Sequence, residues 1–422
     1  MSCLPLIRVP APLISSFRRN LTSLIVLNAL TGLAGLVGGI WFARSLGPGL
    51  MGQYATAVVL LQLVTGVLNA GFNQAVIFDP EDTSLYRAVV TATALQAGAL
   101  IAIVAIALAA YETMSPESAH ELRWPTIGLL VAQLLQLYMN LLTAPLDAKL
   151  AYAFQAMARL TATLCGIAGG VALALKHEGV YALVWRDLII SGVWLAMIMW
   201  YAPRRLQLGW DRAALRKLWT FSLPLWVNNV LEKLTLRLDY AIVGYLLGRD
   251  GMGIYFTLRG IVEGVLGFVV IPVQTIFYAY CCRVNDHKVS QLKPEKWMSV
   301  FPIGMILCVA LALAFGEDVT AKLFGTAFVA GAALLPGFML YAWAILWFEM
   351  IKAQAMSRNQ HRHIATVRVM QLIGIALITM PLIRNWGYWG AGWASGGLAA
   401  MLALLFTVFA FQRKRTAVEI GG

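Results

Sequence analysis

The chain has 422 residues, of which 60% are hydrophobic and only 12% are charged, and its mean hydropathy is +0.74. Apolar runs of about 20 residues recur along the whole chain, which excludes a soluble multidomain protein. The net charge of +12 does not indicate a nucleic-acid-binding protein, because the basic residues lie mainly in the loops between these runs.

Twelve apolar runs are predicted to span the membrane, because each is long enough to cross a hydrocarbon core of ~30 Å. In lipid the backbone must form its hydrogen bonds within each segment, so the spans are predicted to be helices and the fold class is all-α integral membrane protein. The runs are 21–43, 53–78, 89–110, 124–146, 160–175 and 181–200 in the first half, and 221–247, 252–280, 300–315, 328–351, 364–383 and 389–411 in the second.

The distribution of lysine and arginine predicts the orientation of the chain. If the N-terminus is cytoplasmic, the inside segments carry 22 of the 32 basic residues and the outside loops carry six. Cytoplasmic loops are rich in basic residues, so this asymmetry supports the assignment. An even number of spans then places both termini in the cytoplasm.

The two halves of the chain share a repeated pattern. Residues 46–54 read LGPGLMGQY and residues 247–255 read LGRDGMGIY, and GVYALVW (179–185) aligns with GYWGAGW (387–393). Two matches in the same order indicate an internal duplication of six spans. We therefore expect lobes at 1–202 and 218–422, joined by a cytoplasmic linker at 203–217 and related by a pseudo-twofold axis along the membrane normal. This plan is typical of alternating-access transporters with a site between the lobes.

Span 221–247 contains the stretch NNVLEKLTLRLDYAIVG (228–244), with four charges in eight residues. Counting back from the end of the span at about 1.5 Å per residue places Arg237 and Asp239 near mid-membrane, and Glu232 and Lys233 about two turns deeper. At about 100° per residue, the two acids share one face of the helix and the two basic residues share a neighbouring face. A central charge costs at least ~2.5–3.5 kcal/mol in lipid, so neither face is expected to contact lipid.

Further charges occur inside two other spans, as Arg259 with Glu263 and as Arg186 with Asp187. Structural pairing is one explanation, and for Arg186 and Asp187 it is the favoured one. For the four charges of span 221–247 a functional role is favoured. At the repeat offset of 201 residues, their counterparts in the first half are uncharged, as are those of Arg259 and Glu263: Thr31, Gly32, Leu36, Gly38, Val58 and Gln62.

Several motifs resemble the polysaccharide-transport family, the O-antigen and exopolysaccharide flippases of the multidrug/oligosaccharidyl-lipid/polysaccharide exporter superfamily. They are RSLGPGLMGQY, NAGFNQAVIF, LDYAIVG, the second loop LGRDGMGIY and the closing G-x-x-G-A-G-x-A. The resemblance implies a multi-pass protein of the bacterial inner membrane that moves a polyprenyl-diphosphate-linked oligosaccharide from the cytoplasmic to the periplasmic leaflet. It also implies a polysaccharide polymerase and a chain-length regulator as partners, and no enzymatic activity.

On this interpretation the charged side chains face an aqueous cavity between the lobes. Lys233, Arg237 and Arg259 are predicted to bind the diphosphate. Three carboxylates are predicted to tune these cations or to carry a coupling H+ or Na+: Glu232, Asp239 and Glu263. Amide side chains are predicted to contact the sugars: Asn69, Asn73, Gln74, Asn228, Asn229 and Gln274.

Three alternatives have different sequence signatures. The resemblance implies that a multidrug exporter of the same superfamily has an acidic residue inside its N-terminal lobe, whereas spans one to five of this chain contain none. The lipid II flippase family is similar in plan but has arginines in the first two spans and two further spans, and neither feature is present in this chain. A membrane-embedded glycosyltransferase or polymerase needs a large outside loop or acidic catalytic residues. No cofactor or metal site is predicted, and the five cysteines are interpreted as free thiols.

Overall fold

The computed structural model describes residues 11–78, 82–114, 116–148, 152–201, 207–284, 294–357 and 361–419. Within these ranges the side chains at 11–25, 78, 116–119, 148, 224, 228, 268–269, 271–284, 294–302, 353–357, 361–365 and 408–419 are not described. The described residues contain helices and no strand, which confirms the all-α prediction.

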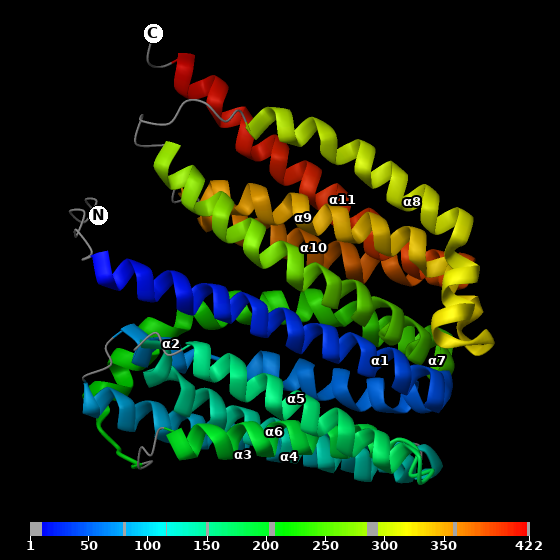
Figure 1. Cartoon of the computed structure of the whole chain (residues 1–422), viewed down its shortest axis with the longest axis horizontal. Helices are drawn as coiled ribbons and strands as arrows, with labels where there is room; N and C mark the ends of the chain where they lie inside the picture. The colour runs from blue at the N-terminus through cyan, green and yellow to red at the C-terminus, as the bar shows by residue number, and fades with distance from the viewer. Residues whose placement is uncertain are drawn as a thin grey trace.

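The helices form two groups that meet along α1 and α7 (Figure 1). The first half of the chain forms α1 (Ala11–Leu68), α2 (Phe72–Phe78), α3 (Thr83–Met114), α4 (Pro116–Ala148), α5 (Tyr152–Ala174) and α6 (Tyr181–Tyr201). The second half forms α7 (Arg212–Val284), α8 (Pro294–Phe324), a 3-10 helix (Thr326–Leu334), α9 (Leu335–Ser357), α10 (His361–Gly374), a π turn (Ile375–Thr379) and α11 (Met380–Glu419).

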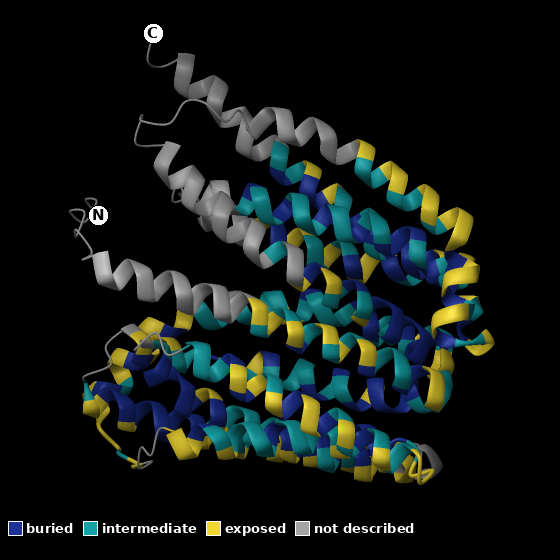
Figure 2. Ribbon diagram, viewed as in Figure 1, coloured by how far each residue is buried: buried dark blue, intermediate teal, exposed yellow. Residues whose placement is uncertain are grey.

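Eight helical stretches in the described part of the chain are long and apolar enough to span a membrane. The protein is therefore a multi-pass membrane protein, while the count of twelve spans and the lobe boundaries stay predictions. Large apolar side chains such as Ile106, Ile303 and Leu377 are mostly exposed. Exposed residues recur along many of the helices (Figure 2). Such a surface suits lipid, because lipid tails are as apolar as these side chains.

The repeated motif forms the tips of two helical hairpins. Both α1 and α7 reverse direction at a glycine with positive φ, Gly47 (φ 74°) and Gly248 (φ 71°), which are equivalent at the offset of 201. The tips touch reciprocally: a Cβ on Gly52 would overlap the carbonyl of Arg249, and a Cβ on Gly253 would overlap the carbonyl of Pro48. Glycine is required at both positions because the two backbones approach so closely. This reciprocity is what a duplicated hairpin produces around a twofold axis.

The α1 hairpin is interrupted at residues 69–71, between α1 and α2. Gly71 has φ 68°, and the last carbonyls of α1 lose their helical partners. Side chains from two other helices replace those partners. Trp226 of α7 donates to the carbonyl of Val67 at 2.6 Å, and Gln96 of α3 donates to the carbonyl of Leu68 at 2.8 Å. The break is therefore held open by tertiary contacts.

Asp82, which caps α3, joins this helix to the start of α7. Its carboxylate accepts hydrogen bonds from the Ser84 hydroxyl at 2.6 Å and from the backbone N–H of Leu85, and it pairs with Lys217 of α7 at 3.0 Å. These contacts hold the pKa of Asp82 well below its usual range. Within the predicted linker, residues 207–211 are not helical, whereas 212–217 already form the first turns of α7.

Candidate functional site

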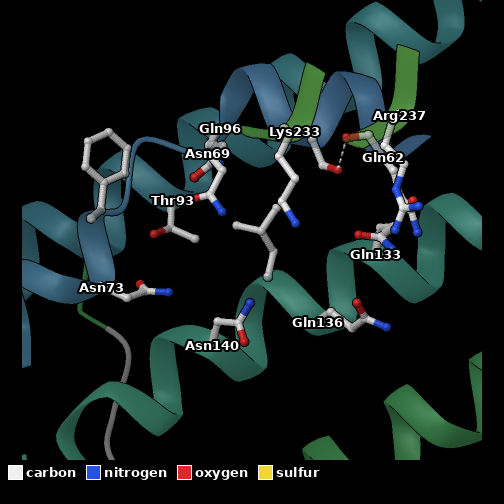
Figure 3. A pocket seen from close by; sticks show the side chains of 14 residues that line it. Gln62, Asn69, Asn73, Thr93, Gln96, Gln133, Gln136, Asn140, Lys233 and Arg237 are labelled. Atoms are coloured by element: carbon white, nitrogen blue, oxygen red, sulfur yellow. Dashed lines mark hydrogen bonds between the residues drawn. The ribbon is translucent and has the colours of Figure 1, made fainter. Parts of the chain in front are cut away.

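A polar cavity of about 270 Å³ lies among α1, α2, α3, α4 and α7 (Figure 3). It lies inside a bundle whose surface is apolar. Polar side chains are costly within a membrane, so a cluster of them indicates a functional site. Its lining includes amides, hydroxyls and two cations but no carboxylate among the residues that the structure describes. The lining residues are Gln62, Thr65, Gly66, Asn69, Phe72, Asn73, Thr93, Gln96, Gln133, Gln136, Leu137, Asn140, Lys233 and Arg237.

Lys233 extends from α7 into the cavity toward α4 (Figure 3). Its stem packs against Gly66 of α1, where an added Cβ would lie 2.6 Å from the Lys233 Cβ. No carboxylate pairs with its ammonium group in the described part of the chain. Lys233 therefore contributes an uncompensated positive charge that is available to an anionic ligand.

Arg237 lines the same cavity one turn further along α7. Its guanidinium pairs with Glu263 at 3.5 Å and lies 5.1 Å from the ring centre of Tyr240. The distance to Glu263 is long for a charge-assisted hydrogen bond, and the side chain remains 20% exposed. Arg237 is therefore oriented by Glu263 while still presenting donors to the cavity.

Arg259, in contrast, is buried in a network behind the cavity, with only 3% of its side chain exposed. It pairs with Asp239, and its Nε donates to Glu263 at 3.0 Å. It also donates to the Tyr255 hydroxyl at 2.6 Å and lies 4.3 Å from the ring centre of Tyr341. Such saturation is what a buried arginine requires, because an unpaired buried charge is very costly. Arg259 and Asp239 therefore do not line the cavity.

The structure brings only some of the predicted sugar-contacting amides to the cavity. Asn69 and Asn73 line it, and Asn229 donates to the backbone carbonyl of Asn69 at 3.4 Å. Gln74 is exposed and lies outside the lining. The side chains of Asn228 and Gln274 lie outside the described residues. Glu232 is half-buried and forms no ion pair with any residue of the described ranges. None of these ligand roles is tested by the arrangement, so they stay predictions.

Sequence reasoning missed most of the amide wall of the cavity. On α4, Gln133, Gln136 and Asn140 follow one another at intervals of three and four residues and so occupy one helix face. This polar stripe within an apolar run was the available signal. Gln62 and Gln96 had no comparable pattern, because Gln96 is the single amide in its span and Gln62 has no other amide within six residues on either side.

The pair Arg186–Asp187 of α6, for which structural pairing was favoured, does form an ion pair at 2.7 Å. The Tyr54 hydroxyl of α1 donates to Asp187 at 2.6 Å and accepts from Arg186 at 2.8 Å. The pair therefore joins α6 to α1 within the first half of the chain.

The structure therefore has a polar cavity among apolar membrane helices, an arrangement that membrane transporters share. The chain resembles the solved lipid II flippase MurJ in an inward closed conformation (TM-score 0.73, 12% identity, 92% of this chain and 87% of that chain). It also resembles an inward-facing multidrug resistance MATE transporter of the MOP superfamily (TM-score 0.67, 13% identity, 93% and 96%) and MATE in the straight conformation (TM-score 0.54, 14% identity, 95% and 96%). At these identities the likeness shows the fold alone.

A family model described as polysaccharide biosynthesis protein matches residues 41–328. The chain therefore belongs to this polysaccharide biosynthesis family, which agrees with the resemblance that its motifs show. No curated protein sequence matches the chain. The structures that it resembles are those of transporters and a flippase, so the chain shares the fold of these proteins.

Proposed function

We propose that this MOP-type transporter moves a polyprenyl-diphosphate-linked oligosaccharide from the cytoplasmic to the outer leaflet of the bacterial inner membrane by alternating access, with both termini cytoplasmic. The supporting observation is the charge of the cavity. Lys233 and Arg237 project into a space whose other described polar groups are neutral amides and hydroxyls. Such a lining attracts an anion and provides both donors and acceptors for hydroxyl groups.

In this proposal Lys233 and Arg237 bind the diphosphate, while Arg259 acts as a positioning residue through Glu263. The buried contacts of Arg259 do not favour its predicted role as a direct ligand, because its donors already point at protein oxygens. Glu263, which holds both arginines, is the proposed site of coupling to H+ or Na+, with Glu232 as a second carboxylate on α7. The lipid tail remains in the bilayer.

The same lining disfavours the alternative of a multidrug exporter for organic cations. A cationic drug needs a carboxylate or an aromatic surface, whereas the described lining of the cavity has no carboxylate and has two cations. The structural likeness to MATE transporters does not change this, because it concerns the fold.

The test deletes the gene in its native host and measures surface polysaccharide and diphosphate-lipid-linked oligosaccharide in the same extract. We expect loss of the polysaccharide and accumulation of the lipid-linked precursor, both restored by the wild-type gene. Lys233→Met, which retains packing on Gly66 but removes the charge, should restore transport at least about tenfold less well. Lys176→Ala, at an exposed loop lysine, is the matched control. Normal levels of both products after deletion would contradict the proposal and direct the work to drug-efflux assays.

A further inference from the structure

A second cavity of about 230 Å³ adjoins the first and is displaced toward the hairpin tip at Gly47. The two cavities share Gln62, Gln133 and Gln136, so the second is a continuation of the first into the N-terminal helix group. It contains no lysine or arginine among its described lining residues. The lining consists of Tyr54, Val58, Leu61, Gln62, Leu129, Ala132, Gln133, Gln136, Asp187 and Ile190.

The shared amides are not satisfied by the protein. The Gln62 Oε1 atom is buried and has no hydrogen-bond partner among the described atoms. The Gln133 amide likewise forms no hydrogen bond within the described ranges, and Gln136 forms only a long one, to Ser191 at 3.3 Å. A buried polar group without a partner costs about 1–3 kcal/mol, so the Gln62 oxygen is placed for a partner from outside the protein. The amides of Gln133 and Gln136 are partly exposed and can bind the same partner.

Asp187 adds a fixed acceptor at the far end of this second cavity. One of its carboxylate oxygens accepts from Arg186 and the other accepts from the Tyr54 hydroxyl, so its orientation is set by protein contacts. Arg186 also compensates its charge, so the pair attracts a free cation weakly. The carboxylate oxygens of Asp187 still have lone pairs that can accept a hydrogen bond from a neutral donor such as a sugar hydroxyl.

We propose that this second cavity is a subsite for an uncharged, hydroxyl-rich sugar unit of the lipid-linked substrate. The assignment rests on the proposed function. The diphosphate lies at Lys233 and Arg237, and the glycan extends from there past Gln62 and Gln133 toward Asp187. Amides and a neutralised carboxylate recognise hydroxyl groups and carry no net attraction for phosphate, so the two parts of the substrate are recognised separately.

The test measures lipid binding by native mass spectrometry of the full chain in nanodiscs. The probes are undecaprenyl diphosphate, which has no sugar, and the lipid-linked oligosaccharide extracted from the deletion strain. Wild-type protein should bind the oligosaccharide lipid more tightly than undecaprenyl diphosphate. The double variant Gln62→Leu/Gln133→Leu should lose about tenfold in affinity for the oligosaccharide lipid and none for undecaprenyl diphosphate. Lys233→Met should weaken both.

Gln207→Leu, at an exposed amide before α7, is the matched control and should bind both lipids as the wild type does. The single variant Gln133→Leu, whose amide has no partner among the described residues, provides a milder change if the double variant folds poorly. Equal affinities of wild-type protein for the two probes, or unchanged oligosaccharide binding in both glutamine variants, would overturn the subsite and leave the proposed function standing. Binding of neither lipid by wild-type protein would overturn both proposals.

Discussion

The hairpins formed by α1 and α7 have equivalent backbones but different chemistry. Both turn at a glycine of the same conformation, and each inserts a glycine against a carbonyl of the other. Yet α7 carries Glu263 where α1 carries Gln62, and Arg259 where α1 carries Val58. In the first half the cavity wall is built from neutral amides, whereas the second half supplies its charge.

Under the proposed function, this difference divides the recognition of the diphosphate and of the sugars between the two halves of the chain. A buried charge requires compensation, and α7 provides it through the network of Asp239, Arg259 and Glu263. Amides need no counter-charge, so α1 and α4 can place them in the cavity without a supporting network. One half is thus suited to an anion and the other to neutral hydroxyl groups.

The largest expected effect on stability comes from replacing Arg259, which lies at the centre of the charged network of α7. Arg259→Met leaves two acids without their shared partner, and we expect a loss of about 3–5 kcal/mol of stability. Thermal unfolding of the purified protein in detergent measures it. The triple variant Arg259→Met/Asp239→Asn/Glu263→Gln removes the unpaired charges and should recover most of the loss. An unfolding midpoint for Arg259→Met equal to that of the wild type would show that the network is not structural.

A second pair of variants separates ligand binding from pairing at the cavity. Arg237→Gln should reduce transport at least about tenfold, because a charge-assisted contact to phosphate is lost. It should reduce stability little, because Glu263 keeps Arg259 as a partner at 3.0 Å. Adding Glu263→Gln should not rescue transport. If the double variant transports normally, then Arg237 serves only to pair with Glu263.

The symmetry of the hairpin tips can be tested at Gly52 and Gly253. Alanine at either position overlaps a carbonyl of the opposite tip, so we expect similar destabilisation, of about 1–3 kcal/mol, in both variants. Gly35→Ala is the control, because no atom lies within 4 Å of its added Cβ. Thermal unfolding of the three variants makes the comparison. A large effect at only one tip would contradict equivalent contacts.

The smallest expected effect concerns the cap at Asp82. Asp82→Ala removes the α3 cap and the Lys217 pair, and should cost about 1 kcal/mol at pH 7, whereas Asp82→Asn retains a capping oxygen and should cost less. The pKa of Asp82 is lowered by folding, so its contribution is complete above the unfolded value near 3.8 and is lost as the pH falls through the folded value. Unfolding midpoints of wild type and Asp82→Ala should therefore converge below about pH 4. A constant difference down to pH 3 would indicate that the charge contributes nothing.

Parts of the site followed from sequence pattern alone. The clustered charges at 232–239 were visible because charge is rare in a membrane span, and the repeat offset showed that they belong to one half. The amide stripe on α4 obeys the same helical periodicity and was overlooked because amides occur singly in many spans. The burial of Arg259 could not be predicted from its spacing to Glu263. Its other partners, Asp239, Tyr341 and Ser395, are distant from it in sequence.

The sequence by itself determined that this is an all-helical membrane protein with two equivalent hairpin tips, because apolar run length, backbone hydrogen bonding in lipid and the positions of the glycines act locally along the chain. Only the tertiary structure decided which charges face the cavity. Lys233 lies in the open and Arg259 is enclosed, although both occur on α7. That distinction depends on which helices pack beside each residue, and packing between helices distant in sequence leaves no periodic signal in either one.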